Sequence, residues 1–269
     1  MTAARVVVTG AGGGIGAALA RRFAADGARV VVNDLDAAAA AAVAAEIGGL
    51  AVPGDAGNEA DVRRLVELAE RELGGIDLFC ANAGVLSVGT QDAPDDVWLR
   101  DFNVNVMSHV YVARALLPRW LDTGQPKRLL LTVSAAGLLT LLGSAPYAVT
   151  KHAALAFAEW LRATYAHRGL IVQALCPQGV RTDMLHTGGD SASRAQLAEG
   201  ALEPAEVAAV VAKALDGDTF LILPHPEAAD YYRRRAADPD RWLAGMNKLQ
   251  QAFEQGGFEQ RGFEQGAAG

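Results

Sequence analysis

The chain has 269 residues, of which 51% are hydrophobic. This is enough for one large domain with a buried core, and it argues against a disordered chain. The formal net charge is −7 and no basic patch stands out, so we expect no nucleic-acid partner.

The two cysteines, Cys80 and Cys176, each stand in an apolar run, which indicates buried free thiols in a reducing compartment. The chain enters a strand-like run near its start and shows no secretory signal there. No apolar run is long enough to cross a membrane. We therefore expect a cytoplasmic protein with no membrane partner, and we predict no metal site.

Short β-branched runs alternate with Ala- and Leu-rich amphipathic segments along the chain. The predicted strands are 5–9, 29–33, 50–53, 76–80, 127–133, 170–175 and 219–223. The predicted helices are 15–26, 36–47, 58–73, 95–121, 146–167, 204–215 and a group at 226–250. This alternation is typical of a parallel sheet covered on both faces, whose ligands bind at the carboxyl ends of the strands.

We thus predict a single α/β domain over 1–250, with a Rossmann-type, doubly wound, seven-stranded parallel sheet and helices on both faces. The remaining residues, 251–269, repeat Phe-Glu-Gln between glycines. The five-residue spacing of this repeat fits neither a helix nor a strand, so we predict a flexible tail.

The loop after the first predicted strand is rich in glycine and reads Thr9-Gly10-Ala11-Gly12-Gly13-Gly14-Ile15-Gly16. Glycines let the backbone turn tightly and approach a pyrophosphate. The helix that begins near Ile15 would aim its free N–H groups at that phosphate. Because the loop stands between the first strand and the first helix, it predicts a dinucleotide site that includes Gly10, Gly14, Ile15 and Gly16.

Asp34 ends the second predicted strand, about 20 residues beyond the glycines, where a carboxylate can hydrogen-bond the adenosine ribose diol. The same carboxylate would repel a 2′-phosphate, and no Arg or Lys follows within the next three residues. This pattern predicts NAD rather than NADP. The alternative is that Asp34 only caps the next helix, a role that is equally open to Asp36.

Two further loops are candidate parts of the cofactor site. Asp55, beside Ala56 after the third strand, could accept a hydrogen bond from the adenine amino group. A supporting role at the start of the next helix is an equally good interpretation of Asp55. After the fourth strand, the small residues Asn82-Ala83-Gly84 form a turn that would let a cofactor lie close.

Tyr147 and Lys151 stand four residues apart in a predicted helix, so their side chains share one face. A lysine ammonium beside the phenol would lower the phenol's pKa from its ordinary value of about 10 toward neutrality. Such a pair occurs by chance in many helices, so its meaning depends on the motifs that precede it.

Together, Thr9-Gly10-x-x-x-Gly14-Ile15-Gly16, Asn82-Ala83-Gly84, Asn105, Ser134 and Tyr147-x-x-x-Lys151 resemble the short-chain dehydrogenase/reductase family in its compact single-domain form. The resemblance implies that Tyr147 is the base in alcohol oxidation or the acid in carbonyl reduction. Lys151 would lower the pKa of Tyr147 and hold the nicotinamide ribose. Ser134 would orient the substrate oxygen. Asn105, with Asn103 as a competing candidate, would anchor a water that links Lys151 to solvent.

The same resemblance implies cofactor contacts after the sixth strand, at Pro177, Gly179, Val180 and Thr182. The family usually has Pro-Gly where this chain has Pro177-Gln178, so we expect Gly179 to take the strained backbone position instead. The residues that follow, 183–203, predict a substrate lid, because a long loop in a compact domain is usually functional.

The side chains predicted to line the substrate pocket are small or aliphatic: Leu86, Leu138, Leu139, Leu141, Leu142, Ala145, Met184 and Leu185. No Arg is well placed to clamp a carboxylate or phosphate, so we expect an apolar secondary alcohol or ketone that is cyclic, terpenoid, steroid-like or aromatic. The resemblance implies a homo-oligomer, either a tetramer or a dimer.

The predicted function is therefore the NAD-dependent oxidation of a secondary alcohol. The two rivals are an NADP-dependent carbonyl reductase and a non-catalytic NAD sensor built on the same fold.

Overall fold

The computed structural model describes residues 4–121, 124–187, 197–198 and 200–255. Its seven strands are parallel and form one sheet in the order β3-β2-β1-β4-β5-β6-β7. They are β1 (Arg5–Val8), β2 (Arg29–Val32), β3 (Leu50–Ala51), β4 (Leu78–Ala81), β5 (Lys127–Thr132), β6 (Leu170–Leu175) and β7 (Leu221–Ile222). The prediction of a doubly wound α/β sheet is confirmed, with the strand order reversing direction between β1 and β4.

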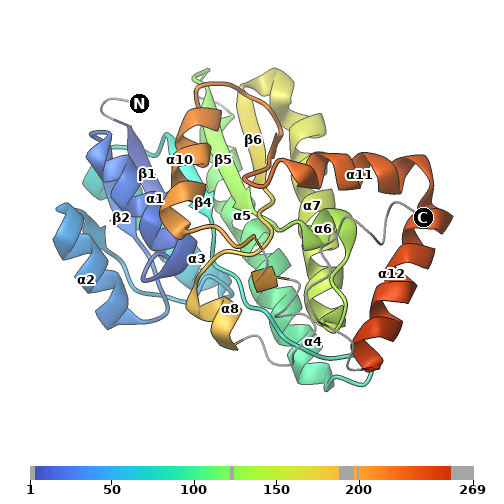
Figure 1. The fold of residues 1–269 in the computed structure, drawn as a ribbon. Helices are drawn as coiled ribbons and strands as arrows, with labels where there is room; N and C mark the ends of the chain where they lie inside the picture. Colours follow the sequence, from blue (N-terminus) through green and yellow to red (C-terminus); the bar gives the residue numbers. More distant parts are fainter. Residues whose placement is uncertain (1–3, 122–123, 188–196, 199, 256–269) are drawn as a thin grey trace.

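Helices cover both faces of this sheet (Figure 1). One face packs against α1 (Gly14–Ala25), α2 (Ala37–Ile47) and α10 (Pro204–Ala214). The other face packs against α3 (Glu59–Leu73), α5 (Ser108–Trp120) and α7 (Ala145–Tyr165). Because successive side chains of a strand point to opposite faces, Val6 and Val8 of β1 join the first core and Val7 joins the second.

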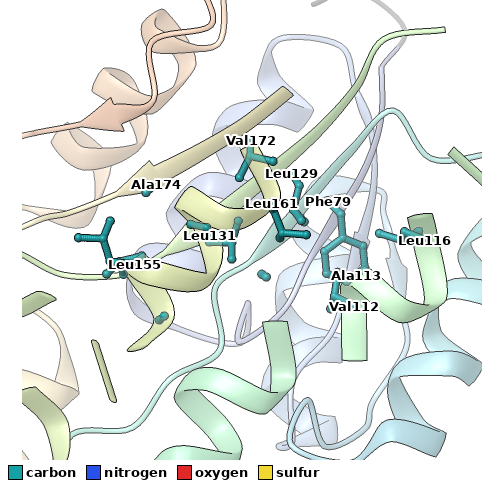
Figure 2. Close-up of a cluster of buried hydrophobic side chains, with 14 of the residues drawn as sticks. Phe79, Val112, Ala113, Leu116, Leu129, Leu131, Leu155, Leu161, Val172 and Ala174 are labelled. Carbon is teal, nitrogen blue, oxygen red and sulfur yellow. The ribbon is translucent and has the colours of Figure 1, made fainter. Parts of the chain in front are cut away.

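The second of these cores fixes α5 and α7 against the middle of the sheet. Figure 2 shows Phe79 of β4 among side chains of α5, and Leu161 of α7 near the leucines of β5. Phe79, Leu116 and Leu161 are fully buried. Each such side chain contributes roughly 1.5–3 kcal/mol through burial, so α5 and α7 are held firmly against the middle of the sheet.

The predicted continuous helix over 95–121 is wrong, because the structure divides it into three parts. These are α4 (Asp95–Phe102), a π-helical turn η1 (Asn103–Met107) and α5. A π-helical turn admits one extra residue, which changes the direction of the side chains that follow it. The interruption surrounds Asn105, one of the predicted site residues, and hydrophobic periodicity alone gives no signal for it.

The C-terminal helices are α11 (Glu227–Ala237) and α12 (Pro239–Glu254), on the right of Figure 1. Of these two helices, α11 contacts the short α6 (Ala136–Leu139). The predicted tail therefore starts too early, since α12 continues four residues past 250. Trp242 and Met246 anchor this helix in the second core. The rest of the predicted tail, 256–269, lies outside the described residues. Within the residues that the structure describes, each helix is too short or too polar to cross a membrane.

Candidate active site

A cavity of about 390 Å³ opens at the carboxyl ends of the strands, where β1 and β4 adjoin. All the residues predicted to contact the cofactor, from Gly10 to Thr182, line it. Ser134 lines it as well, next to Tyr147 and Lys151. The structure thus brings the glycine loop and the predicted catalytic side chains into one cavity, as expected for a ligand at the switch point of a doubly wound sheet.

The glycine loop is held by hydrogen bonds to the neighbouring strand ends. The Asn82 amide donates to the carbonyl oxygens of Thr9 and Gly10, at 3.0 and 3.2 Å, and its Oδ1 accepts from Thr132 at 3.0 Å. A Cβ at Gly16 would lie 2.1 Å from the Gly10 carbonyl oxygen, so any side chain there is excluded. These contacts give the loop one conformation.

The start of α1 fits an anionic ligand. Its N-cap, Gly13, has no side chain to satisfy the first N–H groups, whereas Asp36 caps α2 and Asn58 caps α3. Uncapped N–H groups at a helix start are donors for a phosphate. A Cβ on Gly13 would meet nothing within 4 Å, so the space in front of the helix is open.

The structure separates the roles of Asp34 and Asp36. Asp36 accepts hydrogen bonds from Ala38 N and Ala39 N at 2.9 and 3.1 Å, so it is the cap of α2. Asp34 instead lines the cavity and accepts from Gly12 N at 2.8 Å. The helix-cap interpretation of Asp34 is therefore wrong, and its carboxylate faces the cavity.

Asp55 has a similar relation to its helix. Asn58 accepts from Ala60 N and Asp61 N and so caps α3. Asp55 accepts from Gly57 N at 2.7 Å in the preceding turn and lines the cavity. Its side chain thus orders the turn and is also placed to meet a ligand.

The predicted catalytic pair lies on the first two turns of α7. Tyr147 and Lys151 are both buried, and the Lys151 Nζ lies 5.5 Å from the centre of the Tyr147 ring. Lys151 also donates to the carbonyl oxygen of Thr132 at 3.2 Å. Ser134 is held nearby at the end of β5, where its Oγ accepts from Ala136 N at 3.1 Å.

The expectation that the pKa of Tyr147 is lowered is wrong for the chain by itself, because the protein's own groups raise this pKa. Burial raises the pKa of Tyr147 to about 12, and a hydrogen bond with Ser134 only partly opposes this effect. Burial also lowers the pKa of Lys151 to about 8. Removal from water thus acts more strongly on the phenol than any neighbouring charge of the chain, and it keeps the phenol protonated at neutral pH.

Asn105 lies just behind the cavity and is fully buried. Its amide accepts from Val85 N and donates to Val85 O, at 2.9 and 3.0 Å, and it also donates to Thr150 Oγ1 at 3.0 Å. A Cβ at Gly84 would lie 3.2 Å from Asn105 Oδ1 and 3.4 Å from Lys151 Nζ, so both atoms flank the same small residue.

The competing candidate, Asn103, is engaged elsewhere. Its amide donates to the Gly57 carbonyl at 2.6 Å, and its Oδ1 accepts from Tyr111 at 3.3 Å. Asn105 is therefore the asparagine that joins α7 to the loop after β4. Its predicted water-anchoring role stays a prediction.

The loop after β6 departs from the expected geometry. The φ angle of Gly179 is not positive, so the expected strained backbone position is wrong. A Cβ there would instead lie 1.5 Å from the Leu197 carbonyl oxygen, so glycine is needed for close approach. Gln178 N donates to His225 Nδ1 at 3.1 Å and Gln178 Nε2 donates to Glu227 at 2.7 Å, which ties this loop to the chain after β7.

The predicted substrate pocket is only partly right. Leu86, Met184 and Leu185 line the cavity. Five other predicted residues do not line it: Leu138, Leu139, Leu141, Leu142 and Ala145. The short helix α6 turns the side chains of Leu138 and Leu139 into the second core, and Leu142 packs against the same core. Leu141 is buried beside Tyr147.

Five apolar residues that line the cavity were missed from the sequence: Leu35, Val85, Val104, Val133 and Leu197. Val104 belongs to the π-helical turn η1, and the sequence gave no signal for the direction of its side chains. Leu197 lies within the predicted lid, 183–203, and the parts of that lid at 188–196 and 199 lie outside the described residues. The described part opens with α8 (Asp183–Thr187). In the part of the chain that the structure describes, no group of His, Cys, Asp and Glu could hold a metal ion.

Comparison with known proteins identifies the family. The family model for short chain dehydrogenases matches residues 4–192. The chain belongs to the short-chain dehydrogenase/reductase family. Its members bind a nicotinamide cofactor, and the uncapped α1, the glycine loop, Asp34 and Lys151 are residues that fit such a group.

Two relatives from this family carry the resemblance over most of the chain. The 1-deoxy-11-beta-hydroxypentalenate dehydrogenase of Streptomyces exfoliatus is 40% identical over 230 residues, which are 82% of this chain and 83% of the relative. The meso-2,3-butanediol dehydrogenase of Serratia marcescens is 33% identical, covering 81% of this chain and 89% of the relative.

Among solved structures, a short-chain dehydrogenase/reductase from Burkholderia phymatum in complex with NAD has a TM-score of 0.82 to this chain. It is 26% identical, and the alignment covers 89% of this chain and 95% of the other. The family match and the two dehydrogenase relatives together support an oxidoreductase that acts on a secondary alcohol.

Proposed function

We propose that the protein is an NAD-dependent dehydrogenase that oxidises an apolar, cyclic secondary alcohol to a ketone, and that it also runs the reverse reaction. One observation carries the proposal. A single cavity is lined by Asp34 at the glycine loop and by Ser134, Tyr147 and Lys151 beyond it. The residues that select the cofactor and those that transfer the proton can thus act on a cofactor and a substrate bound in the same cavity.

The choice of NAD rests on the charges around Asp34. Its carboxylate would accept hydrogen bonds from a ribose diol and repel a 2′-phosphate. Among the described residues that line the cavity, the basic side chain is Lys151, which belongs to the reacting end. The neighbour from Burkholderia phymatum, solved with NAD, gives further support. When bound, the dinucleotide supplies the hydride acceptor.

The chain's own residues handle the proton. Ser134 orients the substrate oxygen, and Tyr147 accepts the hydroxyl proton in oxidation or donates it in reduction. A phenol whose pKa is raised to about 12 is a ready proton donor at neutral pH, which suits the reduction of a ketone. In oxidation the Lys151 ammonium has to stabilise the phenolate, and a lysine pKa of about 8 leaves most molecules charged at pH 7.

The proposed substrate follows from the apolar side chains near Tyr147. Leu86, Leu185 and Leu197 line the cavity, and Leu86 and Leu197 pack against the cluster that includes Tyr147. The name of the Streptomyces relative identifies its substrate as a hydroxypentalenate, whereas the Serratia relative acts on a small diol. Apolar cyclic alcohols, cyclic hydroxy acids and small diols are therefore the classes to compare.

The first test measures initial rates of NADH formation with these three classes of alcohol. We expect the highest kcat/KM with apolar cyclic secondary alcohols, and a preference for hydroxy acids or for small diols would contradict the proposed pocket. Cofactor choice is measured in parallel with NADP. Wild-type turnover that is equal with both cofactors would contradict the assignment of NAD.

The Asp34→Ala variant tests the cofactor prediction directly. Because hydrogen bonds to a charged group contribute about 1.5–3 kcal/mol, we expect kcat/KM with NAD to fall about 10- to 100-fold and the preference over NADP to shrink. Asp36→Ala is the matched control, since Asp36 caps α2. It should lower stability by about 1 kcal/mol and leave cofactor preference unchanged.

A further inference from the structure

Three fully buried polar side chains recur at four-residue spacing along α4, η1 and α5: Asp101, Asn105 and His109. Asn105 bonds directly to α7 through Thr150, and both α4 and η1 pack against α7. The three residues therefore form a polar stripe behind the helix turns that carry Tyr147 and Lys151. Asn105 is one of the predicted site residues, whereas Asp101 and His109 have no role in the proposed mechanism.

Asp101 is an unusual member of this stripe, because its carboxylate is entirely buried. Its Oδ1 accepts from Ser87 Oγ at 2.7 Å and from the Arg100 guanidinium at 3.2 Å. Its Oδ2 is buried and has no hydrogen-bond partner among the described residues. Arg100 is more than half exposed, so water screens its charge. A buried carboxylate held this loosely is unfavourable unless another cation lies within its field.

We propose that Asp101 is a positioning residue of the active site, whose buried carboxylate acts across the α4–α7 contact to hold Lys151 in its charged form. This inference rests on the proposed function, in which the ammonium of Lys151 stabilises the phenolate of Tyr147. Asp101 touches neither substrate nor cofactor and does not line the cavity. It acts through Lys151.

Four titratable groups interact with Lys151. Tyr147 on α7 lies beside it, and Asp101 on α4, His109 on α5 and Cys176 after β6 interact with it electrostatically. Burial lowers the pKa of His109 to about 3 and raises the pKa of Cys176 to about 12, so both stay neutral near pH 7. Of these four groups, Asp101 is the carboxylate.

The sign of the effect follows from its charge. Burial lowers the pKa of Lys151, and Asp101 opposes that shift because a negative charge favours the ammonium. The same charge raises the pKa of Tyr147 by opposing the phenolate. Removing the carboxylate therefore lowers both pKa values, which moves the pH range of catalysis downward.

The first experiment titrates Lys151 directly in the full chain. The sequence has four lysines, Lys127, Lys151, Lys213 and Lys248, so a protein labelled with 13C at lysine Cε gives few signals, and Lys151→Arg assigns the relevant one. We expect Asp101→Asn to lower the Lys151 midpoint by about half a pH unit or more. Asp96→Asn, an exposed residue of the same helix, is the matched control and should change nothing.

A midpoint in Asp101→Asn that equals the wild-type value would overturn the inference. If the asparagine variant fails to fold, Asp101→Leu replaces it, since apolar groups often substitute for buried charges without loss of stability. The titration needs no turnover, so its outcome is separate from that of the proposed function. An enzyme inactive on all alcohols would defeat the proposed function and leave this test in force.

The second experiment measures kcat for alcohol oxidation against pH. We expect both limbs of the Asp101→Asn profile to move to lower pH relative to wild type and to Asp96→Asn. A residue that is merely structural would lower kcat by the same factor at every pH. That result, together with an unshifted lysine titration, would refute the role given to Asp101.

Discussion

The two ends of the cavity are built in different ways. At the nucleotide end, the backbone of the glycine loop is held by hydrogen bonds to side chains at neighbouring strand ends, as between Gly12 N and Asp34 and between Gly10 O and Asn82. At the reacting end, Ser134, Tyr147 and Lys151 meet only because β5 and α7 pack together. The first end depends on backbone space and the second on the environment of side chains, so different substitutions should damage each.

The largest expected effect is at the reacting end, in Tyr147→Phe. This change removes the phenol oxygen and leaves the ring in its buried cluster. Because a positioned proton donor or acceptor contributes about 10²–10⁴-fold, we expect kcat to fall by that factor in both directions. Steady-state rates of NADH formation and of ketone reduction measure it.

The same variant separates an enzyme from a non-catalytic NAD sensor. Binding of NAD, followed by fluorescence or calorimetry, should stay within about threefold of the wild-type affinity, because the nucleotide end is untouched. If Tyr147→Phe kept full turnover, the proton would pass by another route and the assigned chemistry would fail.

A pair of leucine variants tests where the reacting end stops and the core begins. Leu138 is fully buried in the second core, whereas Leu86 lines the cavity. We expect Leu138→Ala to lower the free energy of unfolding by about 2–5 kcal/mol with little change in substrate preference. Leu86→Ala should do the reverse, lowering kcat/KM for an apolar alcohol roughly tenfold. Chemical denaturation and initial rates measure the two effects, and a loss of substrate preference in Leu138→Ala would contradict the observed packing.

This pair also shows what the sequence could predict. The glycine loop and Asp34 were predictable because each reflects a local rule: a turn that excludes side chains, and a carboxylate at a strand end. Leu138 was not, since α6 turns it into the core and its aliphatic character fits a pocket equally well. The type of a side chain does not specify the direction in which a short irregular segment points it.

The Tyr147 pKa was mispredicted for a related reason. Helical spacing correctly placed the phenol and the Lys151 ammonium on one face of α7, but it carried no information about burial. Desolvation depends on the whole packed environment, and the charge effects of Cys176 after β6 and Asp101 on α4 come from groups that approach only in the fold. The buried Asp101 is such a residue, and its sequence neighbours gave no sign that its carboxylate would be buried on a helix that packs against α7.

The smallest expected effect contrasts two glycines of the nucleotide end. A methyl group at Gly16 would collide with the Gly10 carbonyl and the Asn82 amide, at 2.1 and 2.6 Å, whereas one at Gly13 would meet nothing within 4 Å. We expect Gly16→Ala to lower the free energy of unfolding by about 1–3 kcal/mol, because the backbone has to move to relieve the overlap. Gly13→Ala should change it by less than about 0.5 kcal/mol.

Urea denaturation of the two variants measures this difference in the free energy of unfolding, and it requires no catalytic assay. Equal stabilities would mean that the loop relaxes freely, and the nucleotide end would then be no more rigid than an ordinary surface turn. A loss of stability in Gly16→Ala alone, with Tyr147→Phe as stable as wild type, would show that the nucleotide end depends on backbone space. The reacting end would then depend on side-chain chemistry. Rigidity at the glycine loop and reactivity at α7 would then be separately adjustable features of one site.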